Sequence, residues 1–128
     1  MRLLLDTCSF LWITATPARI PKRVIDIFRD PDSSIFLSVS SAWEIAIKYK
    51  IRRLNLTAAP AHYIADCVTQ YDLKLLDIAL THVTTAGALP LHHQDPFDRL
   101  LIAQAQMENL VIVTPDHAFA AYDVERLW

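Results

Sequence analysis

The chain has 128 residues, of which 53% are hydrophobic and only one is glycine, and its formal net charge is −2. This length suits a single domain with one buried core, and the lone glycine excludes dinucleotide-binding motifs and P-loops, which need several glycines at fixed spacing. Nucleic-acid-binding domains are usually basic, so any contact with nucleic acid requires a local basic patch or a metal ion.

Short apolar runs alternate along the chain with longer amphipathic segments. The pattern predicts strands over 3–5, 35–39, 73–76 and 110–113, with a last short strand at Val124. It predicts a short helix through 10–12 that is capped by Thr7 or Ser9, further helices over 21–29, 40–52, 59–71, 78–88 and 95–108, and a half-turn over 118–121. This alternation indicates an α/β fold in which a parallel sheet of four to five strands is flanked by helices on both faces.

The helix expected over 95–108 organises the rest of the chain. Pro96 suits the first helical position, and Asp95 just before it suits the N-cap. Asp98 falls in the first turn, where the positive end of the helix dipole favours an anion. Beyond Asp98 the helix is apolar on most sides, so we expect a buried helix with carboxylates at its N-terminal end.

The two cysteines, Cys8 and Cys67, lack the spacing of metal ligands and are typical of buried thiols in a reducing compartment. Asp6 interrupts the first apolar stretch too early for a signal peptide. No apolar run approaches the roughly 18 residues of a membrane span. We therefore expect a cytoplasmic protein that does not enter a membrane.

Four carboxylates from distant segments are expected at one edge of the sheet, where ligands bind in open α/β folds: Asp6, Glu44, Asp98 and Asp116. Singly, each has a structural alternative. Asp6 suits an N-cap, and Glu44 completes a capping box with Ser41. Together they would repel one another, and a hard divalent cation would relieve that repulsion. Oxygen ligands suit Mg²⁺ or Mn²⁺, which activate water for phosphoryl chemistry.

Four stretches carry a resemblance to a known family: Leu3–Thr7, Ser38–Lys48, Asp95–Ala105 and Val113–Asp116. In this order and spacing the chain resembles the PIN-domain ribonucleases, in particular the VapC-type toxins of type II toxin–antitoxin systems. The resemblance implies one PIN domain over 1–128, folded as a three-layer sandwich. It also implies a Mg²⁺- or Mn²⁺-dependent endoribonuclease with metal and catalytic residues at Asp6, Glu44, Asp98 and Asp116, and with Asp95 as a less secure ligand.

The same resemblance implies partners. Members of the family cut structured RNA such as tRNA or ribosomal RNA, form homodimers, and are neutralised by an antitoxin that inserts a C-terminal segment into the site. This chain departs from the family pattern at Cys8 and at Arg52-Arg53, where glycine-lysine is frequent. Neither departure removes an acidic residue, so we expect an active enzyme.

A short basic segment is the best candidate for contacts with RNA phosphates. Lys48, Lys50, Arg52 and Arg53 place four cations within six positions. The alternative is a solvated helix end, whose cations complement the negative end of the dipole. Trp43 is expected in the core. The pattern leaves the roles of His92, His93 and His117 open.

Two other functions use similar carboxylates and can be compared with the sequence. A phosphoaspartyl phosphatase of the haloacid dehalogenase type needs a second aspartate two residues after the first, and Cys8 stands there instead. A module that binds metal for stability and docks a partner peptide, without catalysis, is compatible with the sequence because a set of ligands does not by itself establish turnover.

Overall fold

Five parallel strands form one sheet in the computed structural model, which describes residues 1–128, and their order is β3-β2-β1-β4-β5. The strands are β1 (Arg2–Leu5), β2 (Ser34–Ser38), β3 (Lys74–Leu76), β4 (Val111–Val113) and β5 (Arg126–Leu127). The predicted parallel sheet is therefore confirmed. The last strand lies at 126–127 rather than at Val124.

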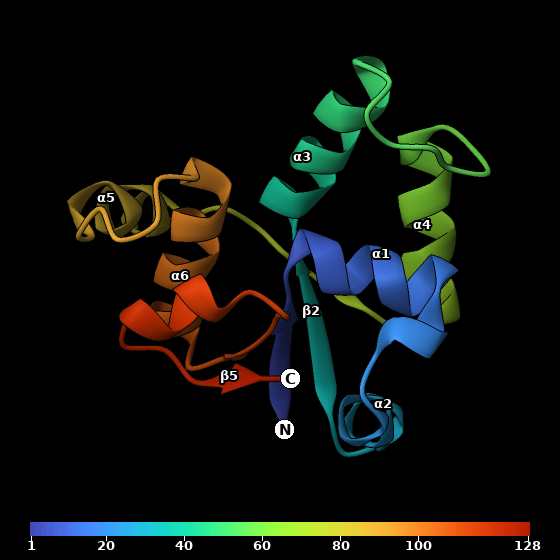
Figure 1. Ribbon diagram of the computed structural model, residues 1–128, viewed down its shortest axis with the longest axis horizontal. Helices are drawn as coiled ribbons and strands as arrows, with labels where there is room; N and C mark the ends of the chain where they lie inside the picture. Colours follow the sequence, from blue (N-terminus) through green and yellow to red (C-terminus); the bar gives the residue numbers. More distant parts are fainter.

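Helices cover both faces of the sheet and complete the predicted three-layer sandwich. They are α1 (Thr7–Ala15), α2 (Lys22–Arg29), α3 (Val39–Lys50), α4 (Pro60–Gln70), α5 (Leu80–Ala88) and α6 (Pro96–Glu108), with 3₁₀ turns η1 (Pro17–Arg19) and η2 (His117–Ala121). Figure 1 shows α1, α2 and α4 on one side of the sheet and α5 and α6 on the other, with α3 above the end of β2. No helix is both long and apolar enough to cross a bilayer.

The two cores follow the alternation of side chains along β1. Leu3 and Leu5 point into a cluster that includes Phe10 of α1, whereas Leu4 points into a second cluster against Leu101 and Ile102 of α6. All six of these leucine, isoleucine and phenylalanine side chains on β1, α1 and α6 are at most 1% exposed. Burial on both faces explains why β1 is an unbroken apolar run.

The starts of two helices differ from the predictions. The N-cap of α1 is Asp6, the structural alternative expected for this residue, rather than Thr7 or Ser9. Its carboxylate accepts a hydrogen bond from the Ser9 amide, and the helix is longer than predicted. The N-cap of α3 is Ser38, so the expected capping box of Ser41 with Glu44 is wrong. Because β2 passes directly into α3, the helix begins earlier, and Glu44 lies beyond the first turn.

The end of α3 explains the glycine that the family often has at the position of Arg52. Arg52 has φ 61°, in the left-handed region, while the amides of Arg52 and Arg53 donate to the carbonyls of Tyr49 and Lys48. These two bonds form a Schellman motif, in which glycine is the usual left-handed residue. The departure at Arg52 therefore affects the helix end and leaves the acidic residues untouched.

Candidate active site

The predicted site residues come from the ends of adjacent elements at the carboxyl edge of the sheet. Asp6 directly follows β1, and Asp116 follows the neighbouring strand β4. β2, on the other side of β1, leads into α3 and Glu44. Asp98 lies in the first turn of α6, the helix that precedes β4. The fold thus brings all four acids to the walls of one cleft of about 460 Å³.

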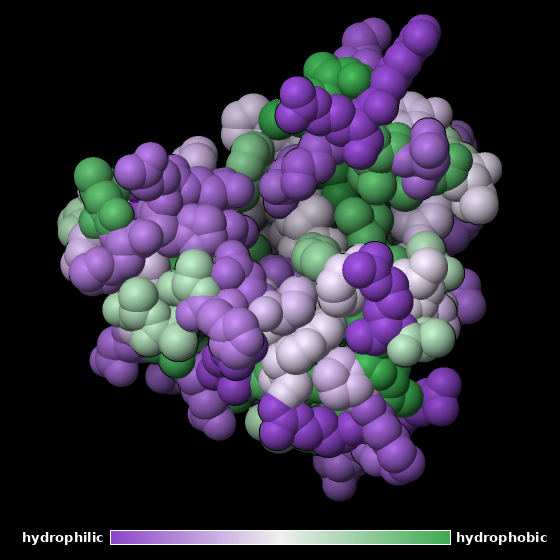
Figure 2. Space-filling model, in the orientation of Figure 1, coloured by the Kyte–Doolittle hydropathy of each residue, from purple (hydrophilic) through white to green (hydrophobic).

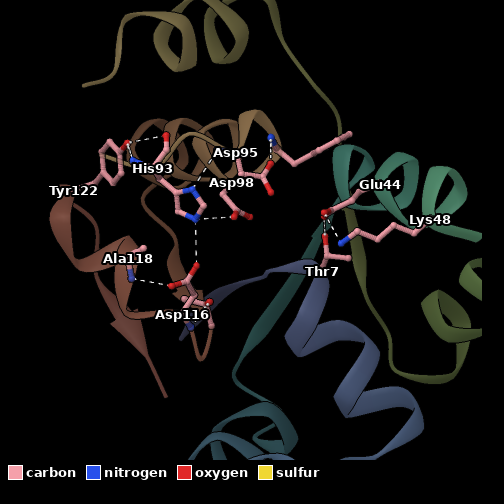
Figure 3. Close-up of polar contacts among 11 residues, drawn as sticks. Thr7, Glu44, Lys48, His93, Asp95, Asp98, Asp116, Ala118 and Tyr122 are labelled. Carbon is pink, nitrogen blue, oxygen red and sulfur yellow. Dashed lines mark hydrogen bonds and ion pairs between the residues drawn. The ribbon is translucent and has the colours of Figure 1, made fainter. Parts of the chain in front are cut away.

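One wall of the cleft is organised around His93. Its Nε2 lies 2.9 Å from Asp98 Oδ2 and 3.2 Å from Asp116 Oδ2, as Figure 3 shows. A ring nitrogen of His93 and one oxygen from each carboxylate all lie within 4.8 Å of one another. The second oxygen of Asp116 accepts a hydrogen bond from the Ala118 amide, so that Asp116 is also the N-cap of η2. Asp98 and Asp116 therefore share a single imidazole.

The opposite wall carries Glu44, which is 7% exposed and already has two partners. Thr7 Oγ1 donates a hydrogen bond to Glu44 Oε1, and Lys48 Nζ lies 2.9 Å from Glu44 Oε2. Figure 3 shows this trio across the cleft from His93. Lys48, one of the predicted RNA-binding residues, is thus engaged with a predicted metal ligand.

Asp6 and Asp95 both cap helices while lining the cleft. Asp6 accepts from the Ser9 amide at 2.7 Å, and Asp95 Oδ1 accepts from the Phe97 amide at 2.9 Å. Burial raises the pKa of Asp6 above its ordinary value, and hydrogen bonds with Thr114 and Ser9 oppose this shift. The capping predicted for Asp95 is confirmed, and each of these residues still faces the cleft.

The pKa of Asp98 is raised from 3.8 to about 7, first by burial and then by the neighbouring charge of Asp95. His93 opposes the shift, while the charges of Glu44 and Asp6 add to it. Asp116 is more exposed, and its pKa is lowered mainly by the bond from the Ala118 amide. Burial, and after it the neighbouring carboxylates, therefore make Asp98 harder to ionise than an ordinary aspartate.

The predicted basic segment divides into two pairs. Lys48 and Arg53 line the acidic cleft, whereas Lys50 and Arg52 line a separate hollow at the end of α3. Figure 2 shows hydrophilic residues on both sides of the recess between α6 and α3. Cys8 also lines the cleft, and burial raises its pKa to about 11, so its thiol stays protonated at neutral pH.

The residues of the cleft fit a divalent cation such as Mg²⁺ or Mn²⁺. The donors on its walls are carboxylate oxygens, which these hard ions prefer. Burial, and after it the charge of Asp95, raises the pKa of Asp98, and a bound cation would favour the ionised carboxylate. The closest group of donors is around Asp98 and Asp116, while Glu44 is held on the far wall by Lys48.

Comparison with known proteins agrees with this architecture. The PIN domain family model matches residues 3–125, and the chain therefore belongs to the PIN domain family. It is similar to Ribonuclease VapC16 of Mycobacterium tuberculosis, with 33% identity over 84 residues, which are 59% of this chain and 60% of that relative.

Two solved structures share the fold across the whole chain. One is VapBC2 from Rickettsia felis bound to a DNA fragment from its promoter, with TM-score 0.73, 15% identity and coverage of 100% of this chain and 99% of that one. The other is DNA-bound VapBC from Salmonella typhimurium, with TM-score 0.71, 17% identity and coverage of 99% and 97%.

Sequence reasoning overlooked two residues that contact the acids. His93 was left open because a loop histidine is usually inert, and Thr7 was considered only as a helix cap. The signal for His93 was its place two residues before the helix cap Asp95. For Thr7, the sequence carried no signal beyond its position next to Asp6, since its partner Glu44 lies 37 residues away.

Proposed function

We propose that this chain is a metal-dependent endoribonuclease toxin. The observation that carries the proposal is the cleft in which Asp6, Glu44, Asp98 and Asp116 meet at the carboxyl edge of the sheet. The family membership and the similarity to a ribonuclease support the same activity. The proposed metal is Mg²⁺ or Mn²⁺, held by these four carboxylates, with Asp95 as a further candidate.

A divalent metal at this cluster supplies an activated water and neutralises charge on the scissile phosphate. The chain's own residues would do the rest. Asp98 releases its proton near pH 7 and then accepts hydrogen bonds or a cation. Lys48 and Arg53 lie on the wall of the same cleft, where their charges suit the phosphates that flank the cut.

The proposed substrate is a structured RNA, tRNA or ribosomal RNA, met in the cytoplasm. The net charge of −2 gives the protein little general attraction for RNA, so contacts must come from the local cations beside the cleft. Lys50 and Arg52, which lie further along the end of α3, would extend the contact to more distant phosphates.

Incubation of the purified chain with total bacterial RNA tests the activity. The arms are Mg²⁺, Mn²⁺ and EDTA, each with wild type, Asp98→Asn and the control Asp66→Asn on the outer helix α4. We expect discrete fragments that require metal, disappear in Asp98→Asn and persist in Asp66→Asn. Metal binding by calorimetry with no cleavage of any RNA would favour the noncatalytic docking module instead.

An antitoxin is the second proposed partner. The solved structures that share this fold include a toxin–antitoxin complex from Klebsiella pneumoniae. The acidic cleft continues past Leu11, Trp12 and Leu54 into a second groove along α1. A partner segment lying in that groove would reach the acids. Co-expression with its antitoxin should give a stable complex that no longer cuts RNA. A complex that cuts at the full rate would contradict this.

We also propose a homodimer. Trp43 is 63% exposed, so the expectation that it lies in the core is wrong. Together with Ile78, Val83 and Phe97, it lines an apolar groove of about 490 Å³ between α3, α5 and the start of α6. A second copy would cover these side chains. Light scattering should give twice 14.6 kDa for wild type and for the control Ile51→Glu, and a monomer for Val83→Glu. A wild-type monomer would refute it.

A further inference from the structure

His93 occupies a loop between α5 and α6, and its ring lies between two acids that come from different elements. Asp98 belongs to α6, whereas Asp116 follows β4, and both carboxylates approach the same atom, His93 Nε2. Figure 3 shows these two contacts from one ring nitrogen. The ring is only 16% exposed, so water competes little for them.

The other ring nitrogen fixes the tautomer. His93 Nδ1 lies 3.2 Å from the backbone nitrogen of Asp95, and a backbone amide is always the donor. Nδ1 must therefore present its lone pair, which leaves the proton of the neutral imidazole on Nε2. Because Nε2 carries this proton, it donates to the carboxylates and has no lone pair with which to bind a metal ion.

The loop that carries His93 is itself held in place. The His93 amide donates to the hydroxyl of Tyr122 at 2.8 Å, and that hydroxyl donates to the Pro90 carbonyl at 2.6 Å. The His93 ring also packs edge-on against Phe119, which is 1% exposed. Contacts from the C-terminal part of the chain thus set where the imidazole points.

We propose that His93 is a positioning residue, whose Nε2–H ties Asp98 to Asp116 and so holds both carboxylates ready for the cation. Without a donor between them, two neighbouring carboxylates repel and turn apart. The histidine uses one oxygen of Asp98 and leaves the other for the metal. Outer hydrogen-bond partners of this kind typically change metal affinity or activity by about 10- to 100-fold. The inference rests on the metal site of the proposed function.

Binding of Mn²⁺, followed by electron paramagnetic resonance at pH 8, tests the role without measuring cleavage. We expect His93→Ala to weaken binding by about 10- to 100-fold. His93→Gln should restore most of it, because the Gln amide places a donor near the position of Nε2. The control is His92→Ala, whose ring packs against Tyr122 and contacts none of the acids; it should bind like wild type.

Two results of the Mn²⁺ experiment would overturn the inference. One is unchanged Mn²⁺ affinity in His93→Ala while Asp98→Asn abolishes binding, which would leave the proposed metal site intact. The other is hyperfine coupling from a directly bound imidazole nitrogen, which would make His93 a ligand. ¹⁵N chemical shifts of the metal-free ring should show the Nε2–H tautomer, and the opposite tautomer would also refute it. Absence of Mn²⁺ binding by wild type would instead defeat the proposed function, and this inference with it.

Discussion

Lys48 and Glu44 lie on successive turns of α3, and Lys48 Nζ is 2.9 Å from Glu44 Oε2. Because Thr7 donates to Oε1, both oxygens of this carboxylate have partners within the chain. The charge of Glu44 on the α3 wall is therefore balanced by Lys48, while the α6 wall carries Asp95 and Asp98. A metal cation that binds Glu44 must therefore compete with Lys48. An RNA phosphate that binds Lys48 must compete with Glu44.

Lys48→Met should separate these two effects. We expect the affinity for Mn²⁺ to rise by about two- to fivefold, since the half-exposed ion pair is worth at most about 1 kcal/mol. RNA binding, measured in an Asp98→Asn background, should weaken. The slope of the logarithm of the RNA affinity against the logarithm of the salt concentration should decrease in magnitude by about one unit, which corresponds to the loss of one phosphate contact.

Lys50→Met is the matched control for Lys48→Met, because Lys50 lies on the same helix outside the acidic cleft. It should leave the affinity for Mn²⁺ unchanged. If Lys48→Met lowered both the metal affinity and the RNA affinity, the competition between the two partners would be disproved.

Metal affinity should depend on pH through Asp98. Its pKa of about 7 means that, at lower pH, a bound metal must displace a proton. We expect the dissociation constant for Mg²⁺ to fall about tenfold per pH unit up to pH 7 and then to level off. Calorimetry in buffers of different ionisation enthalpy would count the released proton, and a constant affinity between pH 5.5 and 8 would contradict the prediction.

Stability of the metal-free protein should show the opposite trend. The folded pKa of Asp98 is raised above the ordinary 3.8, so the folded state holds a proton that the unfolded state has lost. This contribution favours folding at low pH and is lost progressively as pH rises from about 4 to about 7. In EDTA at pH 8, Asp98→Asn should therefore raise the free energy of unfolding, by on the order of 2 kcal/mol. A destabilised variant in urea titrations would refute this.

Arg52→Gly should stabilise the end of α3. Arg52 has φ 61°, and a left-handed conformation costs a non-glycine residue roughly 1–2 kcal/mol, whereas glycine loses somewhat more chain entropy on folding. We expect a net gain of about 0.5 kcal/mol. Differential scanning calorimetry with Lys50→Gly as the control should show a small rise in Tm for the first variant and a fall for the second. A lower Tm for Arg52→Gly would contradict the backbone strain that we infer at Arg52.

Local patterns were enough to predict α6. Asp95 caps it, Pro96 begins it, and its middle turns, Leu101–Ala105, are buried, as the sequence indicated, while Met107 near its end is exposed. The order of strands and helices also predicted that Asp6 and Asp116 lie on one edge, because the carboxyl ends of parallel strands meet there. These are properties of short segments and of chain order.

Partners that lie far apart in the sequence were decided only by the tertiary structure. Trp43 faces solvent although it neighbours the buried Glu44, because the two point to different sides of α3. His93 contacts Asp116 across 23 positions only because Tyr122 and Phe119 hold its loop against the sheet.

Periodicity, capping and strand order are properties of the sequence alone, and from them the α/β fold, the carboxylates at the start of α6 and the meeting of acids at one edge of the sheet could be predicted. The tertiary structure decided how those carboxylates are paired: Glu44 with Lys48 and Thr7, Asp98 with Asp116 through His93. Pairing depends on which side chains cross the cleft within hydrogen-bond distance, and that depends on packing of the whole chain.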